Sequence, residues 1–149
     1  MNRDTVSVCG LVLPSALVSA IASRRWRPPD DAQIYRTVFG DDPELPEFYD
    51  LAAIERQTIS CHSMRDDEQW WMGLESPNSL GIDLSKSVVI ASLGPDMPIV
   101  IDYRVSPDNP RVLYLGIQDS DGQEQSIWRE VAPDVETLIS RLNLVSGGD

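Results

Sequence analysis

The sequence predicts an α+β protein in which helices come first, a meander of antiparallel strands follows, and one helix closes the chain. Apolar residues recur at helical spacing before residue 60, and from Val88 onward they alternate with polar residues at a period of two. Helical spacing returns after Pro133. Because helices and strands are segregated along the chain, the pattern favours α+β over an alternating arrangement with a parallel sheet.

The first expected helix begins at Pro14, which suits the first turn of a helix because it lacks a backbone N–H. Leu17 and Ile21 then repeat at a spacing of four, so that they share one face of the helix. The proline pair at 28–29 stops the segment.

The apolar run 6–22 also resembles the hydrophobic part of a secretory signal peptide that ends near Ala22. Two features favour a folded segment instead. Arg3 is offset by Asp4, so the run is not preceded by an excess of positive side-chain charge, and Pro14 interrupts it. We therefore expect a cytoplasmic protein, with export and cleavage near Ala22 as the alternative.

Two more helices are expected before the strands. Asp30 and Asp31 provide N-cap chemistry for a short helix that ends at Gly40, and Asp50 can cap a helix over residues 51–60. Residues 61–75 fit either a strand or a loop. The apolar residues that should share a face are Ile34 and Val38 in the shorter helix, and Leu51, Ile54 and Thr58 in the longer one.

Four strands are expected after these helices, over residues 88–93, 99–105, 111–117 and 126–131. Turns at 94–97, 106–110 and 119–123 contain the glycine, proline and aspartate residues that tight turns favour. In the second strand Asp102 should point to the face of the sheet opposite to Ile101 and Tyr103, so we expect its carboxylate to be solvated. The closing helix starts at Pro133, and the residues expected to face inward are Val135, Leu138, Ile139 and Leu142.

Length and charge limit the classes of function. The chain has 149 residues, which is the size of one domain, and we predict a single domain over 1–149 with a frayed tail from about residue 146. Its 12 Lys and Arg against 24 Asp and Glu give a formal net charge of −12. Contacts to phosphate need cations, so the composition argues against nucleic acids and anionic membranes as partners.

No catalytic or metal-binding pattern is present in the sequence. His62 is the only histidine, which removes hydrolase triads and sites with two histidines. The adjacent Cys61 cannot easily pair with it, because neighbouring side chains point to opposite faces of a strand and diverge by about 100° on a helix. We expect a buried Cys61, a surface His62, no metal, no cofactor and no enzymatic activity. Whether Cys9 and Cys61 form a disulfide stays open.

The distribution of charge suggests a protein-binding surface. Residues 30–50 contain seven acids and one base, Arg36. The segment is either a solubilising surface or a docking face for a basic partner. The candidate partner-binding residues are Asp41, Asp42, Glu44 and Glu47, together with Trp70 and Trp71, which are either interface anchors or packed in the core.

The C-terminal part of the chain resembles a known family. It reads VVIASLGPDMPIVIDYRV, then PRVLYLG, then WREVAPDVETLISRL. This order of strand, glycine turn, strand ending in aspartate, strand and helix is similar to that of the SUKH superfamily, the Smi/Knr-type proteins. The matching positions are Gly94, Asp102, Val112–Leu115, Val131, Ala132, Glu136, Leu138 and Leu142, with weaker similarity at Leu13–Pro14 and Leu80–Asp83.

The resemblance implies an α+β fold. For bacterial members it also implies an immunity protein that neutralises a cognate polymorphic toxin, often a nuclease; other members are scaffolding or regulatory proteins. We therefore expect a non-catalytic protein-binding module, a monomer or weak dimer, whose partner is a basic toxin domain. The alternatives are a regulatory scaffold protein of the same fold and a small-molecule-binding domain in which Asp83 and Asp102 act as acid or base.

Overall fold

The structure is a computed structural model that describes residues 6–63, 81–94, 97–120 and 123–142. The predicted α+β class is confirmed. Within these ranges there are four α-helices and two antiparallel sheets, one of two strands and one of five. The helices are α1 (Ser15–Ala22), α2 (Ala32–Val38), α3 (Leu51–His62) and α5 (Val135–Arg141), and a 3₁₀ turn, η1, spans Leu84–Lys86.

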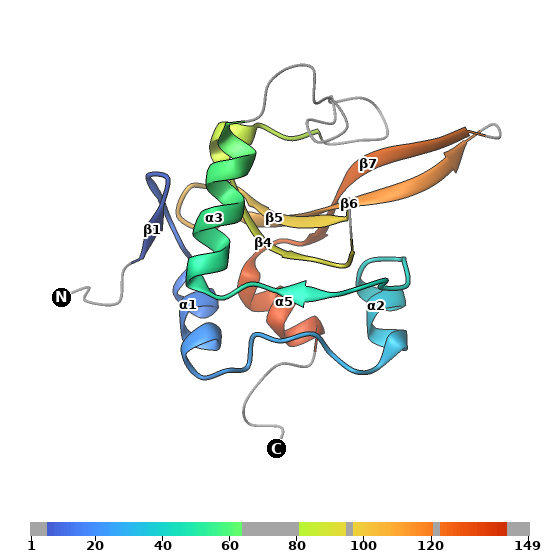
Figure 1. Ribbon diagram of the computed structural model, residues 1–149, viewed down its shortest axis with the longest axis horizontal. Coiled ribbons are helices and arrows are strands. Elements are labelled where there is room, and N and C mark those ends of the chain that lie inside the picture. The colour runs from blue at the N-terminus through green and yellow to red at the C-terminus, as the bar shows by residue number, and fades with distance from the viewer. Residues whose placement is uncertain (1–5, 64–80, 95–96, 121–122, 143–149) are drawn as a thin grey trace.

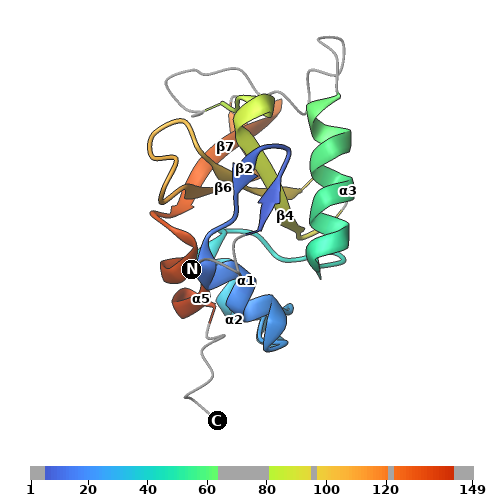
Figure 2. The same ribbon diagram turned by 90° about the vertical axis from the view of Figure 1, so that its left-hand side faces the viewer.

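The larger sheet is a meander in the order β3-β4-β5-β6-β7, with each strand antiparallel to its neighbours. Both views show α1, α2 and α5 grouped beneath this sheet and α3 at its side (Figure 1 and Figure 2). The strands are β3 (Glu47–Phe48), β4 (Ser87–Ser92), β5 (Pro98–Asp102), β6 (Arg111–Ser120) and β7 (Gln123–Ala132), and the smaller sheet pairs β1 (Ser7–Val8) with β2 (Leu11–Val12).

The main core lies between the sheet and the three grouped helices. Alternate residues of β4, β5 and β6 point into it, and α5 with its C-cap Leu142 contributes the four residues predicted to face inward, each at most 5% exposed. A second cluster of buried apolar residues lies on the opposite face of the sheet. Its members are Val89, Val100, Leu113, Leu115 and Trp128, together with Cys61 of α3.

The helix boundaries follow the capping residues. Asp31 accepts a hydrogen bond from the backbone N–H of Gln33, and Asp50 accepts one from Ala53, as expected from the sequence. The closing helix was expected to start at Pro133, but it begins at Val135 because Asp134 is its N-cap and accepts a hydrogen bond from the Thr137 N–H.

Helix α3 covers the part of β4 that β3 leaves unpaired. The Val89 N–H donates to Oγ1 of Thr58 at 3.0 Å, and Nε2 of His62 lies 2.8 Å from the Ser87 carbonyl oxygen. The prediction that Cys61 is buried is confirmed, whereas His62 is half-buried and not a surface residue. His62 lies there because the backbone groups of β4 that β3 leaves unpaired need hydrogen-bond partners.

The sequence did not predict the β1–β2 hairpin, because strands of two residues are too short to show a period. Its turn contains Cys9 and Gly10, both with positive φ, of 53° and 83°. The hairpin is held to the body by Val8 in the core and by the Tyr103 hydroxyl, which donates to the Val12 carbonyl at 2.7 Å. Residues 6–22 are therefore folded against the rest of the domain.

Cys9 and Cys61 are both free thiols; Cys9 is exposed and Cys61 is buried. Burial, and to a smaller extent the neighbouring Cys9, raises the pKa of the Cys61 thiol to about 12. Cys61 is consequently a neutral, packed side chain at neutral pH. None of the described helices is long and apolar enough to cross a membrane.

Candidate partner-binding site

The predicted docking residues lie on the segment between α2 and β3, which we call the acidic segment (residues 41–47). Gly40, with φ of 82°, ends α2 and turns the chain onto the sheet. The N–H groups of Glu44 and Leu45 both donate to the Leu93 carbonyl, at 2.8 and 2.9 Å. The segment then enters the sheet as β3, so its backbone is fixed at two places.

A glycine allows the segment to lie this close to the β4–β5 turn. A Cβ added at Gly94 would lie only 2.9 Å from the Cβ of Glu44 and 3.2 Å from the sulfur of Met97. Real Cβ atoms almost never approach so closely, so any other residue at position 94 would displace Glu44. Gly94 is thus part of what positions the carboxylates.

Asp41 is an anchor and not a freely exposed docking residue. The Tyr114 hydroxyl donates to its Oδ2 at 2.7 Å, across 73 residues of sequence. Burial raises the pKa of Tyr114, and the hydrogen bond to Asp41 raises it further, so the phenol keeps its proton. The Asp41 carboxylate is half-buried against the sheet and holds the acidic segment in place, while its contact with a partner stays a prediction.

Arg129 supports the same junction from β7, where it is paired across the ladder with Tyr114. Its Nη2 donates to the Phe39 carbonyl at 2.5 Å, and its guanidinium carbon lies 5.9 Å from the centre of the Tyr114 ring. A Cβ at Gly116 would come within 2.9 Å of this guanidinium and 3.2 Å of the Asp41 carboxylate. The end of α2, the acidic segment and the β6–β7 ladder meet at this point.

Asp42, Glu44 and Glu47 are exposed, as a docking surface requires. Asp42 forms an ion pair with Arg36, at 2.5 Å between Oδ1 and Nε, with both side chains more than half exposed. Such a surface ion pair contributes little free energy, so the Asp42 carboxylate can exchange Arg36 for a basic group of a partner protein. The predicted aromatic anchors, Trp70 and Trp71, lie outside the described residues, so the structure does not place them beside these carboxylates.

The sequence did not indicate that Tyr114, Arg129 and Arg36 shape this site. A tyrosine that alternates inward on a buried strand was the available signal, because a buried hydroxyl needs a hydrogen-bond partner. Nothing in the sequence indicated that the partner would be Asp41.

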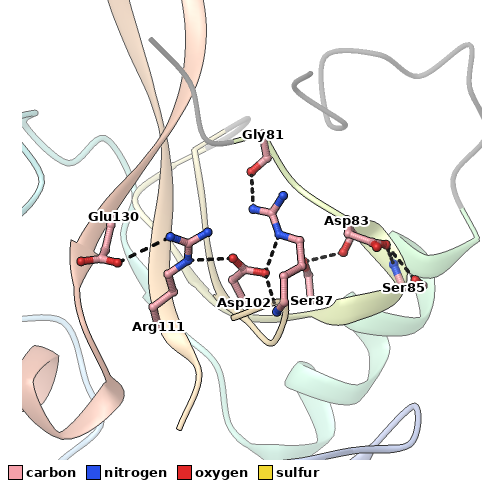
Figure 3. A network of polar contacts seen from close by, with 8 residues as sticks. Gly81, Asp83, Ser85, Ser87, Asp102, Arg111 and Glu130 are labelled. Carbon is pink, nitrogen blue, oxygen red and sulfur yellow. Dashed lines mark hydrogen bonds and ion pairs between the residues drawn. The ribbon is translucent and has the colours of Figure 1, made fainter. Parts of the chain in front are cut away.

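The prediction that Asp102 is solvated was wrong. Its side chain is completely buried and accepts hydrogen bonds from Nε of Arg104 at 2.9 Å and from Nε of Arg111 at 2.8 Å (Figure 3). Burial alone would raise the pKa of this carboxyl, but the hydrogen bonds from the two arginines outweigh burial and hold it below its usual range. Arg104 also donates to the Gly81 carbonyl at 3.1 Å.

The other carboxylate considered for acid–base chemistry, Asp83, also has a local structural role. Its Oδ1 accepts hydrogen bonds from the N–H and the hydroxyl of Ser85, at 3.1 and 2.7 Å, at the start of η1 (Figure 3).

An open pocket of about 440 Å³ lies elsewhere on the protein, and neither Asp83 nor Asp102 lines it. The lining residues are Arg27, Pro28, Pro29, Asp30, Asp31, Ile34 and Leu142. Within the described ranges, no three His, Cys, Asp or Glu side chains are arranged to hold a metal ion.

The fold and this site define an α+β domain with an acidic segment anchored on its sheet. Comparison with known proteins found no family model, no curated protein and no solved structure that matches the chain. What the domain does is therefore argued from its own residues.

Replacing Tyr114 by phenylalanine tests the anchor. We expect the free energy of unfolding to fall by about 1–2 kcal/mol, because a buried hydrogen bond to a carboxylate is lost. Urea denaturation measures the change. The matched control is Tyr49→Phe, which removes a hydroxyl bonded at 3.3 Å to the neutral Ser92 and should cost less. Equal losses in the two variants would show that Asp41 adds nothing.

Proposed function

We propose that this protein is a non-catalytic binding module that docks a basic protein partner through its acidic segment. The observation that carries the proposal is the contrast between a fixed backbone and exposed carboxylates. Leu93, Gly94 and the Asp41–Tyr114 hydrogen bond hold the segment, while Glu44 and Glu47 face solvent. A partner that meets charge already held in place loses little conformational entropy on binding.

The resemblance to the SUKH superfamily and the net charge of −12 suggest what kind of partner this is. We infer an immunity protein that covers the basic substrate cleft of a cognate toxin, of the nuclease type, in the cytoplasm. Opposite charge on the two surfaces would speed association and select the correct toxin. Trp70 and Trp71 remain the candidate hydrophobic anchors of the contact.

Retention of the N-terminal residues is part of this proposal. Val8, Leu13, Leu17 and Ala20 are each at most 3% exposed and belong to the main core. A protease that cleaved near Ala22 would remove all four. Their burial supports an intact chain over a processed, exported one.

The first experiment is affinity capture of the tagged full-length protein from its own cells at low and at moderate salt, followed by mass spectrometry. We expect one stoichiometric basic protein that is lost as the salt concentration rises. A captured partner that is acidic, or that is retained unchanged at moderate salt, would contradict docking by charge.

Charge reversal then locates the contact. The variant Asp42→Lys, Glu44→Lys, Glu47→Lys should slow association with the captured partner at least tenfold at low salt and flatten its salt dependence. The matched control reverses three exposed acids elsewhere, Glu55, Asp108 and Glu136, and so has the same net charge. Equal slowing in both variants would assign the effect to net charge and remove the acidic segment from the interface.

A further inference from the structure

The two edges of the five-stranded sheet differ in how they are protected. At one edge β3 is only two residues long, and Thr58 and His62 of α3 occupy backbone groups of β4 that β3 leaves unpaired. Short edge strands and covering helices are common ways to prevent unwanted strand pairing. This edge is therefore closed to a further strand.

The other edge is β7, ten residues long. Among the described strands its only neighbour is β6. One contact on its backbone from outside the sheet lies at the inner end, where Nη1 of Arg141 donates to the Val131 carbonyl at 2.7 Å. Figure 1 shows β6 and β7 projecting together past the helices, so the outer part of β7 stands away from the body of the protein.

Within the described residues, the outer part of β7 carries few of the features that prevent strand addition. Residues 123–127 contain no proline and no lysine, and the one irregularity in the ladder lies at Val112 and Leu113, at the opposite end. An edge of this length without proline, lysine or a bulge is a template for another strand.

Charge identifies the kind of strand that would fit. In the β6–β7 hairpin, the described stretches 112–120 of β6 and 123–128 of β7 contain no Lys or Arg and two acids, Asp119 and Glu124. A second copy of this chain would bring the same acids and its own net charge of −12, so self-pairing is disfavoured. A strand that alternates Lys or Arg with β-branched residues suits both the backbone and the charge.

The base of this hairpin is also the place where the acidic segment is anchored. Gly116 pairs with Ile127 across the ladder, and a Cβ at Gly116 would lie 3.2 Å from the Asp41 carboxylate. One partner could therefore contact the acidic segment and the β7 edge together.

We infer that the outer edge of β7, residues 123–127, takes an extended basic segment of the protein partner as a sixth strand of the sheet. This inference rests on the proposed function, because it adds a second contact to the same partner. Main-chain hydrogen bonds would supply affinity, and the alternate basic side chains would supply specificity.

The probe is a displayed library of linear nine-residue peptides selected against the full-length protein. We expect the enriched sequences to alternate Lys or Arg with Val, Ile or Thr. Hydrogen–deuterium exchange with one such peptide should slow at the amides of residues 123–127. A version of that peptide methylated at alternate backbone nitrogens keeps its side chains but should bind at least tenfold more weakly, since it cannot complete the ladder.

A variant of the edge separates this contact from general charge effects. Gln125→Lys with Ser126→Lys places two lysines in the outer part of β7 and should weaken the peptide at least tenfold. The control, Gln57→Lys with Ser60→Lys, makes the same charge change at exposed positions of α3 and should leave binding within twofold. Unchanged thermal midpoints show that both variants are folded.

The remaining outcomes overturn the inference in distinguishable ways. Basic peptides that protect the acidic segment alone and bind the edge variant normally would remove the β7 contact and leave the proposed function standing. Enriched peptides without an excess of Lys or Arg would contradict both the basic strand and the basic partner. Failure to enrich any peptide would overturn the β7 contact, while affinity capture would still test the proposed function.

Discussion

Replacing Asp102 by asparagine is expected to lower the free energy of unfolding by about 3 kcal/mol. The carboxylate is fully buried and is bonded to Arg104 and Arg111, whose side chains remain 25% and 20% exposed. Asparagine has nearly the same shape, but it cannot balance two guanidinium charges. The partial exposure of the arginines places the expected loss at the lower end for a broken buried ion pair.

Chemical denaturation at pH 7 measures this change. Asp108→Asn is the matched control, because it removes the charge of an exposed aspartate in the turn after β5 and should leave the unfolding free energy unchanged. If Asp102→Asn were as stable as the control, the two arginines would not be stabilising the β5–β6 pair through Asp102.

The effect of Asp102 should also depend on pH. Its pKa is below the usual range in the folded protein, so the unfolded chain binds the proton more readily. The stabilisation is then fully present above the unfolded pKa, near 4, and is lost as the pH falls through the folded value. The difference in stability between the wild-type protein and Asp102→Asn should shrink below about pH 4. A difference that stayed constant down to pH 2 would contradict the lowered pKa.

Capping residues and apolar spacing in the sequence were sufficient to predict most of the helices and strands. Asp31 and Asp50 cap the helices that their positions predicted, and the four inward residues of α5 are buried because a helix of that spacing presents one apolar face. The strands of two residues, β1 and β3, could not be predicted, because neither is long enough to repeat a pattern. Strand β3 forms because the longer β4 lies beside it, whereas β1 pairs across a tight turn with β2, which is equally short.

The same limit applies to the candidate site. Exposure of Asp42, Glu44 and Glu47 follows from their position in a polar loop, so composition was enough to predict it. The roles of Asp41 and Asp102 depend on partners brought close by strand register and chain path. Tyr114 is 73 residues from Asp41, and Arg111 is nine residues from Asp102. A count of charges does not contain that information.

Deleting the first 22 residues is expected to abolish cooperative unfolding altogether. The deletion removes β1, β2 and α1, and with them Leu17 and Ala20, which are fully buried, and Val8 and Leu13, which are 3% exposed. Burying one large apolar side chain contributes about 1.5–3 kcal/mol. A domain has a net stability of only about 5–15 kcal/mol, so losing several such side chains and the surface that packs on them exceeds what the rest can supply. Thermal denaturation followed by circular dichroism measures the result.

Leu17→Ala provides a graded form of the same test. Leu17 of α1 is fully buried in the main core, so truncation leaves a cavity and should lower the unfolding free energy by about 2–5 kcal/mol. Ser15→Ala, at an exposed position in the same helix, should change it little. A truncated protein that melts at the same temperature as the full chain would show that the segment is dispensable and would favour export with cleavage near Ala22. The expected loss of folding would mean that a form cleaved near Ala22 lacks four buried residues that the main core needs, namely Val8, Leu13, Leu17 and Ala20.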